Sequence, residues 1–398
     1  MIRNRIAHGL AGGVALVLLL SASPALPQSE PAPIATYWMT ARTSVGMPGM
    51  GGGRPDPMAM MAAMSGGSAP QHDLLLQLGS TQTPTGAASA DHLPPAGLKA
   101  GDRLPLVGVK RSQGAESSPG QELPRDTPRL IVYYGCGEAG RAPITYQLSQ
   151  DGGRQFAAMV AAHRVVGQKP PSPETSRSYG EWPNSRGRQQ RPSGSLVGEH
   201  VVRGNYTPDI RFNLNAGQDF LAPLHVTGTG GSGAHRLQWN AIPNAKGYLL
   251  YAFGQNKAGD MVVWSSSDVP SFPLHIPELL APADLARLQA AKVILPVAAT
   301  SCTIPAAMTA AAPEAMLRVI AFGGEVNMAF PPRPADRRIP WKVESVVKVR
   351  YNSTAGMVLG MESDGDVDSD QSIEEAGPGG LVGSAIGSLF GRKKPKRQ

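Results

Sequence analysis

Alternation of apolar and polar residues predicts short β-strands along most of this chain. The clearest alternation covers residues 341–351, where Val347 and Val349 share one face and Lys348 and Arg350 share the other. Successive side chains of a strand point to opposite faces, so this pattern is typical of a strand with one buried side. Further strands are predicted at residues 35–43, 73–79, 129–135, 143–148, 199–214 and 217–227. We therefore expect a mainly β protein.

Residues 237–254 contain two more apolar strands, one on each side of a turn. Trp239 alternates with polar neighbours before the turn, and Tyr248 and Leu250 share one face after it. The segment between them contains Pro, Asn and Gly, which are the residues that favour turns. This combination predicts a β-hairpin.

The pattern L-x-W-x-A-x-x-x-A-x-G-Y-x-x-Y in this stretch resembles strands B and C of fibronectin type III domains. The resemblance implies a β-sandwich in which Trp239 fills the space between two sheets and Tyr248 packs beside it. Residues 316–328 resemble strands F and G of the same family, with a Gly-Gly pair as their hairpin turn. The resemblance covers about residues 222–331 and leaves room for a helical insertion at PADLARLQAAK. It implies a fold but no particular activity.

A change of period along the chain indicates two β-sandwich-like domains. The first is predicted at residues 26–150, with a Gly- and Met-rich loop at 47–67, and the second at residues 195–352. Residues 151–194 between them are predicted to form a short amphipathic helix followed by a linker rich in Pro, Arg and Ser. The apolar face of this helix recurs at helical spacing in Phe156, Met159, Val160 and His163.

The N-terminal residues 1–25 have the features of a secretory signal peptide. Arg3 and Arg5 precede an apolar run at residues 14–20, and small residues stand at Ser23 and Ala25. This order is typical of a leader that is cleaved after Ala25. We therefore expect an exported protein, in the periplasm or at the cell surface.

The formal net charge of +7 is concentrated at the two ends of the chain. Two of the excess positive charges belong to the predicted leader, and five belong to the last seven residues, 392–398. The predicted folded body is neutral, so its charge does not favour nucleic acid as a partner.

Two cysteines, Cys136 and Cys302, are present in the whole chain. In an oxidising compartment they can form a disulfide, which would tie the two predicted domains together. Two buried free thiols are the alternative that the sequence leaves open.

Two segments contain side chains that are suited to metal ions. Thioether sulfur is a soft ligand that selects Cu(I), whereas carboxylates at positions 1, 3, 5 and 12 of a loop are typical of a calcium site. The acidic segment lacks the glycine that a calcium loop requires at its turn, and the Met-rich segment lacks His or Cys. We interpret both segments mainly as a low-complexity loop and an acidic linker. The candidate ligands are Met58, Met60, Met61 and Met64 for copper, and Asp364, Asp366, Asp368 and Glu375 for calcium.

Residues 353–398 are predicted to form an acidic linker, a glycine-striped segment and a basic tail. Glycine recurs at every fourth residue from Gly379 to Gly391, and the basic residues follow directly. This arrangement favours either peripheral contact with an anionic membrane or a flexible end.

Catalytic motifs are absent from the sequence, and its eight histidines are scattered. We expect a non-enzymatic envelope protein without a cofactor, which binds another envelope protein or a polysaccharide. Copper handling through the Met-rich loop is one alternative, and binding or hydrolysis of carbohydrate is another. The chain also resembles exported β-rich proteins of alphaproteobacteria, through Tyr37-Trp38-Met39 and residues 133–138. That resemblance implies no chemistry.

Overall fold

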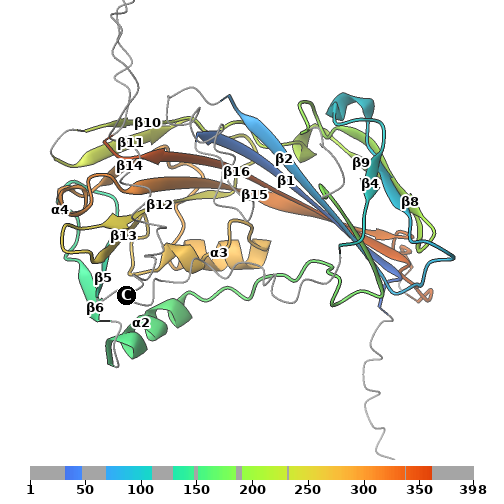
Figure 1. Cartoon of the computed structure of the whole chain (residues 1–398), viewed down its shortest axis with the longest axis horizontal. Coiled ribbons are helices and arrows are strands. Elements are labelled where there is room, and N and C mark those ends of the chain that lie inside the picture. The colour runs from blue at the N-terminus through green and yellow to red at the C-terminus, as the bar shows by residue number, and fades with distance from the viewer. Residues whose placement is uncertain are drawn as a thin grey trace, which may run out of the picture. The chain divides into compact units, whose positions relative to one another are not determined.

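The computed structural model describes residues 32–46, 69–109, 129–147, 151–184, 191–230, 233–336 and 338–360, all of which belong to one compact unit (Figure 1). Strands dominate this unit, which confirms the prediction of a mainly β protein. The strands are β1 (Ala35–Gly46), β2 (Gln71–Ser80), β3 (Ala90–Leu93), β4 (Leu104–Leu106), β5 (Arg129–Tyr134), β6 (Ile144–Gln147), β7 (Ser178–Trp182), β8 (Gly198–Gly204), β9 (Thr207–Leu214), β10 (Val226–Thr229), β11 (His235–Trp239), β12 (Gly247–Gln255), β13 (Met261–Ser265), β14 (Ser301–Ile304), β15 (Met316–Phe330) and β16 (Ser345–Val358).

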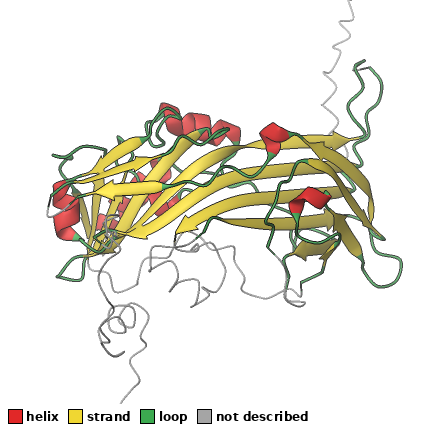
Figure 2. Ribbon diagram, turned by 90° about the horizontal axis from the view of Figure 1, so that it is seen from above, coloured by secondary structure: helices red, strands yellow, loops and turns green. Residues whose placement is uncertain are grey.

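Nine of these strands form one large sheet in the order β6-β5-β13-β12-β15-β16-β1-β2-β7. Two smaller sheets, β10-β11-β14 and β4-β3-β8-β9, both pack against one face of the large sheet and share a hydrophobic core with it. The opposite face is partly covered by helices, as Figure 1 shows. Seen from above in Figure 2, the long strands lie side by side. The helices are α2 (Asp151–Ala162), α3 (Pro282–Ala290), α4 (Ala306–Ala311) and the short 3₁₀ helices η1 (Ala96–Leu98), η2 (Ala216–Gln218) and η3 (Pro273–His275).

Strand β16 explains the clean alternation near the C-terminal end of the described chain. Val347 and Val349 are buried in the core with the smaller sheets, whereas Lys348 and Arg350 point to the opposite face. The strand begins at Ser345, after the predicted start at residue 341, and it continues to Val358. Residues 353–358 are therefore part of the sheet, and the predicted acidic linker does not include them.

The predicted division into two β domains is wrong, because strands from both ranges pair within the large sheet. Strand β1 pairs in parallel with β16 along its whole length, with Tyr37 opposite Val347. At the other end of the sheet, β5 pairs in parallel with β13. Local patterns reveal that each segment is a strand, but they carry no information on a partner that lies hundreds of residues away.

The two predicted hairpins are also wrong. Strands β11 and β12, on either side of the turn at Pro243, belong to different sheets and face each other across the core. Residues 316–330 form one continuous strand, in which Gly323 and Gly324 make a bulge between Phe322 and Glu325. A Cβ atom on Gly323 would lie 2.7 Å from Tyr351, so glycine at this position permits close contact with β16.

The predicted helices are confirmed, whereas the predicted linker contains a strand. Helix α2 covers most of the predicted amphipathic segment, and α3 coincides with the predicted helical insertion. The linker at residues 168–193 contains β7, which pairs with β2 at the edge of the large sheet. Its pattern Ser-Tyr-Gly-Glu-Trp is short and lies among Pro and Arg, so the strand has little local signal.

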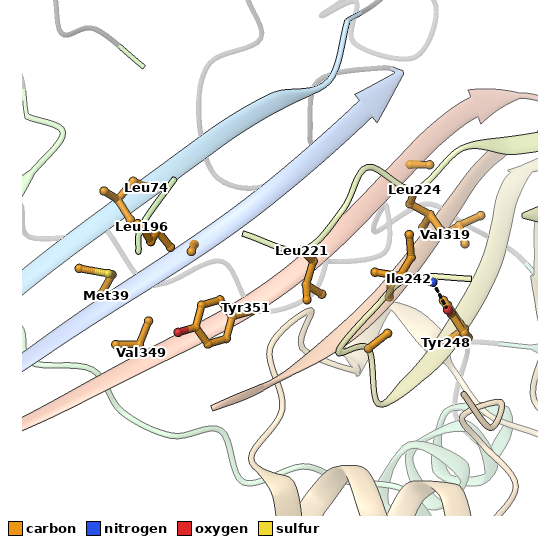
Figure 3. Close-up of a cluster of buried hydrophobic side chains, with 14 of the residues drawn as sticks. Met39, Leu74, Leu196, Leu221, Leu224, Ile242, Tyr248, Val319, Val349 and Tyr351 are labelled. Carbon is orange, nitrogen blue, oxygen red and sulfur yellow. Dashed lines mark hydrogen bonds between the residues drawn. The ribbon is translucent and has the colours of Figure 1, made fainter. Parts of the chain in front are cut away.

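Trp239 and Tyr248 lie where the small sheet containing β11 packs against β12. Trp239 is 5% exposed and Tyr248 is fully buried, with ring centroids 5.6 Å apart. The Tyr248 hydroxyl accepts a hydrogen bond from the backbone N–H of Ile242 at 3.1 Å (Figure 3). The predicted burial of both aromatic residues is therefore confirmed.

A disulfide joins Cys136, just after β5, to Cys302 in β14. The two cysteines are separated by 166 residues, so the bond closes a long loop in the unfolded chain. Chain-entropy arguments assign about 5 kcal/mol of stabilisation to a loop of this length. The bond resolves the two alternatives that the sequence left open.

Truncation of Trp239 tests this packing. We expect Trp239→Ala to lower the free energy of unfolding by about 3 to 5 kcal/mol, because it leaves a cavity between two sheets. Urea denaturation monitored by circular dichroism measures this change. Trp341→Ala, at a half-buried position ahead of β16, is the matched control and should cost much less. Equal stabilities of the parent and the Trp239 variant would contradict the assignment of Trp239 to the core.

Candidate functional site

A cavity of about 200 Å³ lies between the C-terminal end of α2 and the segment around η3. Its position follows from the path of the chain, which leaves β6 at one edge of the large sheet, forms α2, and then continues to β7 at the other edge (Figure 1). Where the chain at the end of α2 passes η3, the side chains of the two segments do not fill the space between them. The apolar lining consists of Met159, Val160, Val165, Phe272 and Ile276.

The amphipathic face of α2 is divided between the core and this cavity. Phe156 packs edge-on against Phe272, with ring centroids 5.0 Å apart, and the Tyr146 hydroxyl donates a hydrogen bond to the Met159 sulfur at 3.3 Å. These contacts fix the helix on the sheet. Four residues after Met159, the chain reaches His163, which lines the cavity together with Arg164 and Val165.

The polar residues in the described lining of this cavity are all basic, namely His163, Arg164 and His275. Burial and the nearby Arg287 guanidinium lower the pKa of His163, while a hydrogen bond to the Pro270 carbonyl opposes this shift. Burial likewise lowers the pKa of His275, whose ring lies 5.1 Å from that of Phe272. The imidazoles therefore face the cavity in their neutral form at neutral pH.

Arg164 supplies a positive charge at the rim of this cavity. Among the described residues, no carboxylate forms an ion pair with Arg164, whereas the nearby Arg287 pairs with Asp284 at 3.0 Å. Arg287 also donates a hydrogen bond to the Arg164 carbonyl, which joins α3 to the chain that leaves α2. The cavity thus combines an apolar floor with a positively charged rim.

A second polar cluster, on the same face of the large sheet, is a partly buried ion-pair network. Glu278 accepts hydrogen bonds from Arg318, at 2.8 Å, and lies 3.3 Å from the Arg42 guanidinium. Burial alone would raise the pKa of Glu278, but Arg318 and Arg42 outweigh it and lower that pKa. Asn352 completes the network by binding both Arg42 and the Glu278 carbonyl. These contacts hold the segment after η3 on the sheet.

Trp38 is buried beside this network, and two cations from β16 lie near its ring. The Arg350 guanidinium lies 4.5 Å from the Trp38 ring and the Lys348 ammonium lies 5.3 Å from it. Burial lowers the pKa of Arg350 to about 10, although Glu325 opposes this effect. Lys348 pairs with Glu325 at 2.9 Å, and the Arg350 side chain donates to Thr40. Since all these groups are engaged within the sheet, we assign the cluster a structural role.

Between the large sheet and the four-stranded sheet, a chain of hydrogen bonds runs through two buried histidines. The atom pairs are Tyr37 Oη and His92 Nδ1 at 2.9 Å, His92 Nε2 and His200 Nδ1 at 3.1 Å, and His200 Nε2 and the Leu196 carbonyl at 2.7 Å. The carbonyl can only accept, so in the neutral pair each imidazole donates from Nε2 and accepts at Nδ1. When both rings are protonated, two N–H groups face each other and the hydrogen bond between His92 and His200 is lost.

The sequence-predicted site residues have different outcomes. Cys136 and Cys302 are bonded, and Trp239 and Tyr248 are structural core residues. The candidate metal ligands and the glycine-striped tail lie outside the described residues, and they remain predictions. These are Met58, Met60, Met61, Met64, Asp364, Asp366, Asp368, Glu375 and residues 379–398.

Within the described ranges, no group of three or more His, Cys, Asp or Glu side chains is arranged to hold a metal ion. No helix of this part of the chain combines the length and the apolar character needed to cross a membrane. Comparison with protein-family models, with curated proteins and with solved structures finds no match to this chain.

Sequence reasoning missed the cavity because its walls are far apart in the chain. His163 was part of the recognised helical face, but that face predicted only a connector. His275 lies in a segment without a clear period, more than a hundred residues later. The one available signal was that a histidine occupies an otherwise apolar helical face.

The buried histidine chain predicts a loss of stability in acid. Burial lowers the folded-state pKa of His92, with repulsion from His200 adding to it, and burial also lowers the pKa of His200. A group with a lowered folded-state pKa binds protons preferentially in the unfolded chain. Stability is therefore intact above the ordinary histidine pKa and falls as the pH drops below it, by about 1.4 kcal/mol per histidine at a pH one unit lower.

Urea denaturation of the parent and of His92→Gln at pH 7.5 and at pH 5.5 measures this effect. Glutamine can accept from Tyr37 and donate to His200 without titrating, so the variant should lose part of the pH dependence. His72, His163 and His275 also have lowered pKa values and contribute equally in both proteins. The same pH dependence in both proteins would show that His92 is not held neutral.

Proposed function

We propose that the protein is exported and acts in the cell envelope through binding, without catalysing a reaction. The observation that carries this proposal is the disulfide between Cys136 and Cys302. Structural disulfides persist in oxidising compartments such as the periplasm and are rare in the cytosol. The predicted leader at residues 1–25 points to the same destination.

The arrangement of the strands supports a fibronectin type III-like unit within this protein. In immunoglobulin-like sandwiches, strands B and E share one sheet and strands C, F and G share the other. Strands β11 and β14 are neighbours in the small sheet, and β12, β15 and β16 are neighbours in the large one. Such domains commonly serve binding and structural roles, although the fold alone identifies no ligand. We propose another envelope protein or a polysaccharide as the partner.

Export and oxidation can be tested together in a Gram-negative host. The full chain should appear in the periplasmic or envelope fraction, begin at residue 26 by mass spectrometry, and react with a thiol-specific polymer only after reduction. Deletion of residues 2–25 provides the matched control, which should stay in the cytoplasm with reactive thiols. If the full chain remains in the cytoplasm with its leader and both free thiols, the proposal is wrong.

A further inference from the structure

We propose that the cavity between α2 and η3 binds a small carboxylate with an apolar body, about the size of one aromatic ring or a short acyl chain. This inference goes beyond the proposed envelope role and does not depend on it. It rests on the volume of the cavity, on the chemistry of its lining and on the charge at its rim.

The size of the cavity limits the ligand. Its volume is about 200 Å³. An apolar protein cavity of about 150 Å³ is large enough to bind benzene. One ring with one small substituent therefore fits, whereas a sugar chain or a peptide does not.

The lining selects an apolar body. Met159 and Phe272 are held by the core contacts of α2 and form a preorganised apolar wall, and Ile276 continues this wall towards α3. Burial of an aromatic ring or an acyl chain against these side chains provides the nonpolar part of the binding free energy. These apolar side chains offer a ligand no strong hydrogen bonds, so they do not favour a fully hydrated ion.

The rim selects negative charge. Arg164 supplies a guanidinium that is unpaired among the described residues, and a guanidinium can bind a carboxylate through two parallel hydrogen bonds. His275 has no hydrogen bond from its ring to the described protein, so its nitrogen atoms are available to the ligand. Among the described lining residues there is no acidic side chain to repel an anion or to attract a cation. Together these groups favour a carboxylate over a neutral or cationic molecule of the same shape.

Benzoate and benzamide are a matched pair of probes, because they share the ring and differ in charge. Isothermal titration calorimetry with the mature full-length protein at pH 7 should give an affinity for benzoate that is roughly ten- to hundredfold higher than that for benzamide, as a charge-assisted hydrogen bond provides. Arg164→Gln should remove this preference. Arg203→Gln, which changes an exposed cation on β8, should leave it unchanged. Near-ultraviolet circular dichroism confirms that each variant is folded.

A second variant and a pH series locate the binding site independently. Val160→Phe adds bulk to the cavity wall and should weaken both probes. Bound benzoate favours the protonated imidazoles, so its affinity should rise between pH 7.5 and pH 6, and His275→Gln should reduce this rise. Equal affinities for benzoate and benzamide, benzoate binding that Arg164→Gln and Val160→Phe both leave unchanged, or no heat at about 10 mM benzoate would each overturn the proposal.

Discussion

The parallel pairing of β1 with β16 is the constraint on which the rest of this structure depends. It joins residues at the two ends of the described chain, with Ala35 opposite Ser345 and Gly46 opposite Gly356. Parallel neighbours cannot be connected by a tight turn, so the chain between them must cross the sheet. The small sheets and the helices all belong to the part of the chain between these two strands. The two small sheets cover one face of the large sheet, and α2, α3 and the chain that leads to β7 run along the other.

The same pairing explains how charged residues come to be buried opposite the main core. Trp38, Thr40 and Arg42 of β1 alternate with core residues, and their partners across the register are Lys348, Arg350 and Asn352 of β16. The segment after η3 adds Glu278, which forms ion pairs with both Arg42 and Arg318. The crossover that covers this face also forms α2, and the incomplete contact between α2 and η3 produces the basic cavity. The candidate site is therefore a consequence of the topology.

The sequence predicted the type of most elements, because period and turn residues are local properties. It predicted the β class, helices α2 and α3, and the burial of Trp239 and Tyr248. It failed where the outcome depends on distant partners. The alternation in β1 and β16 could not show that these strands pair, so residues 26–150 were assigned to a separate domain. The Gly323-Gly324 pair has the same local signal for a turn and for a bulge, and only contact with Tyr351 decides between them. The cavity was hidden for the same reason, since His163 and His275 meet only in the folded chain.

The central claim is that the N-terminal and C-terminal strands form one cooperative sheet, and the most direct test is to separate them. Residues 195–360, expressed alone, lack β1 to β7, so the apolar face of β16 loses its neighbours on β1 and β2. The account predicts that this fragment shows no cooperative urea unfolding transition and no native near-ultraviolet circular dichroism, whereas the mature chain shows both. A cooperative transition and a native spectrum in the fragment would contradict it, because they would show that the C-terminal strands form a domain of their own.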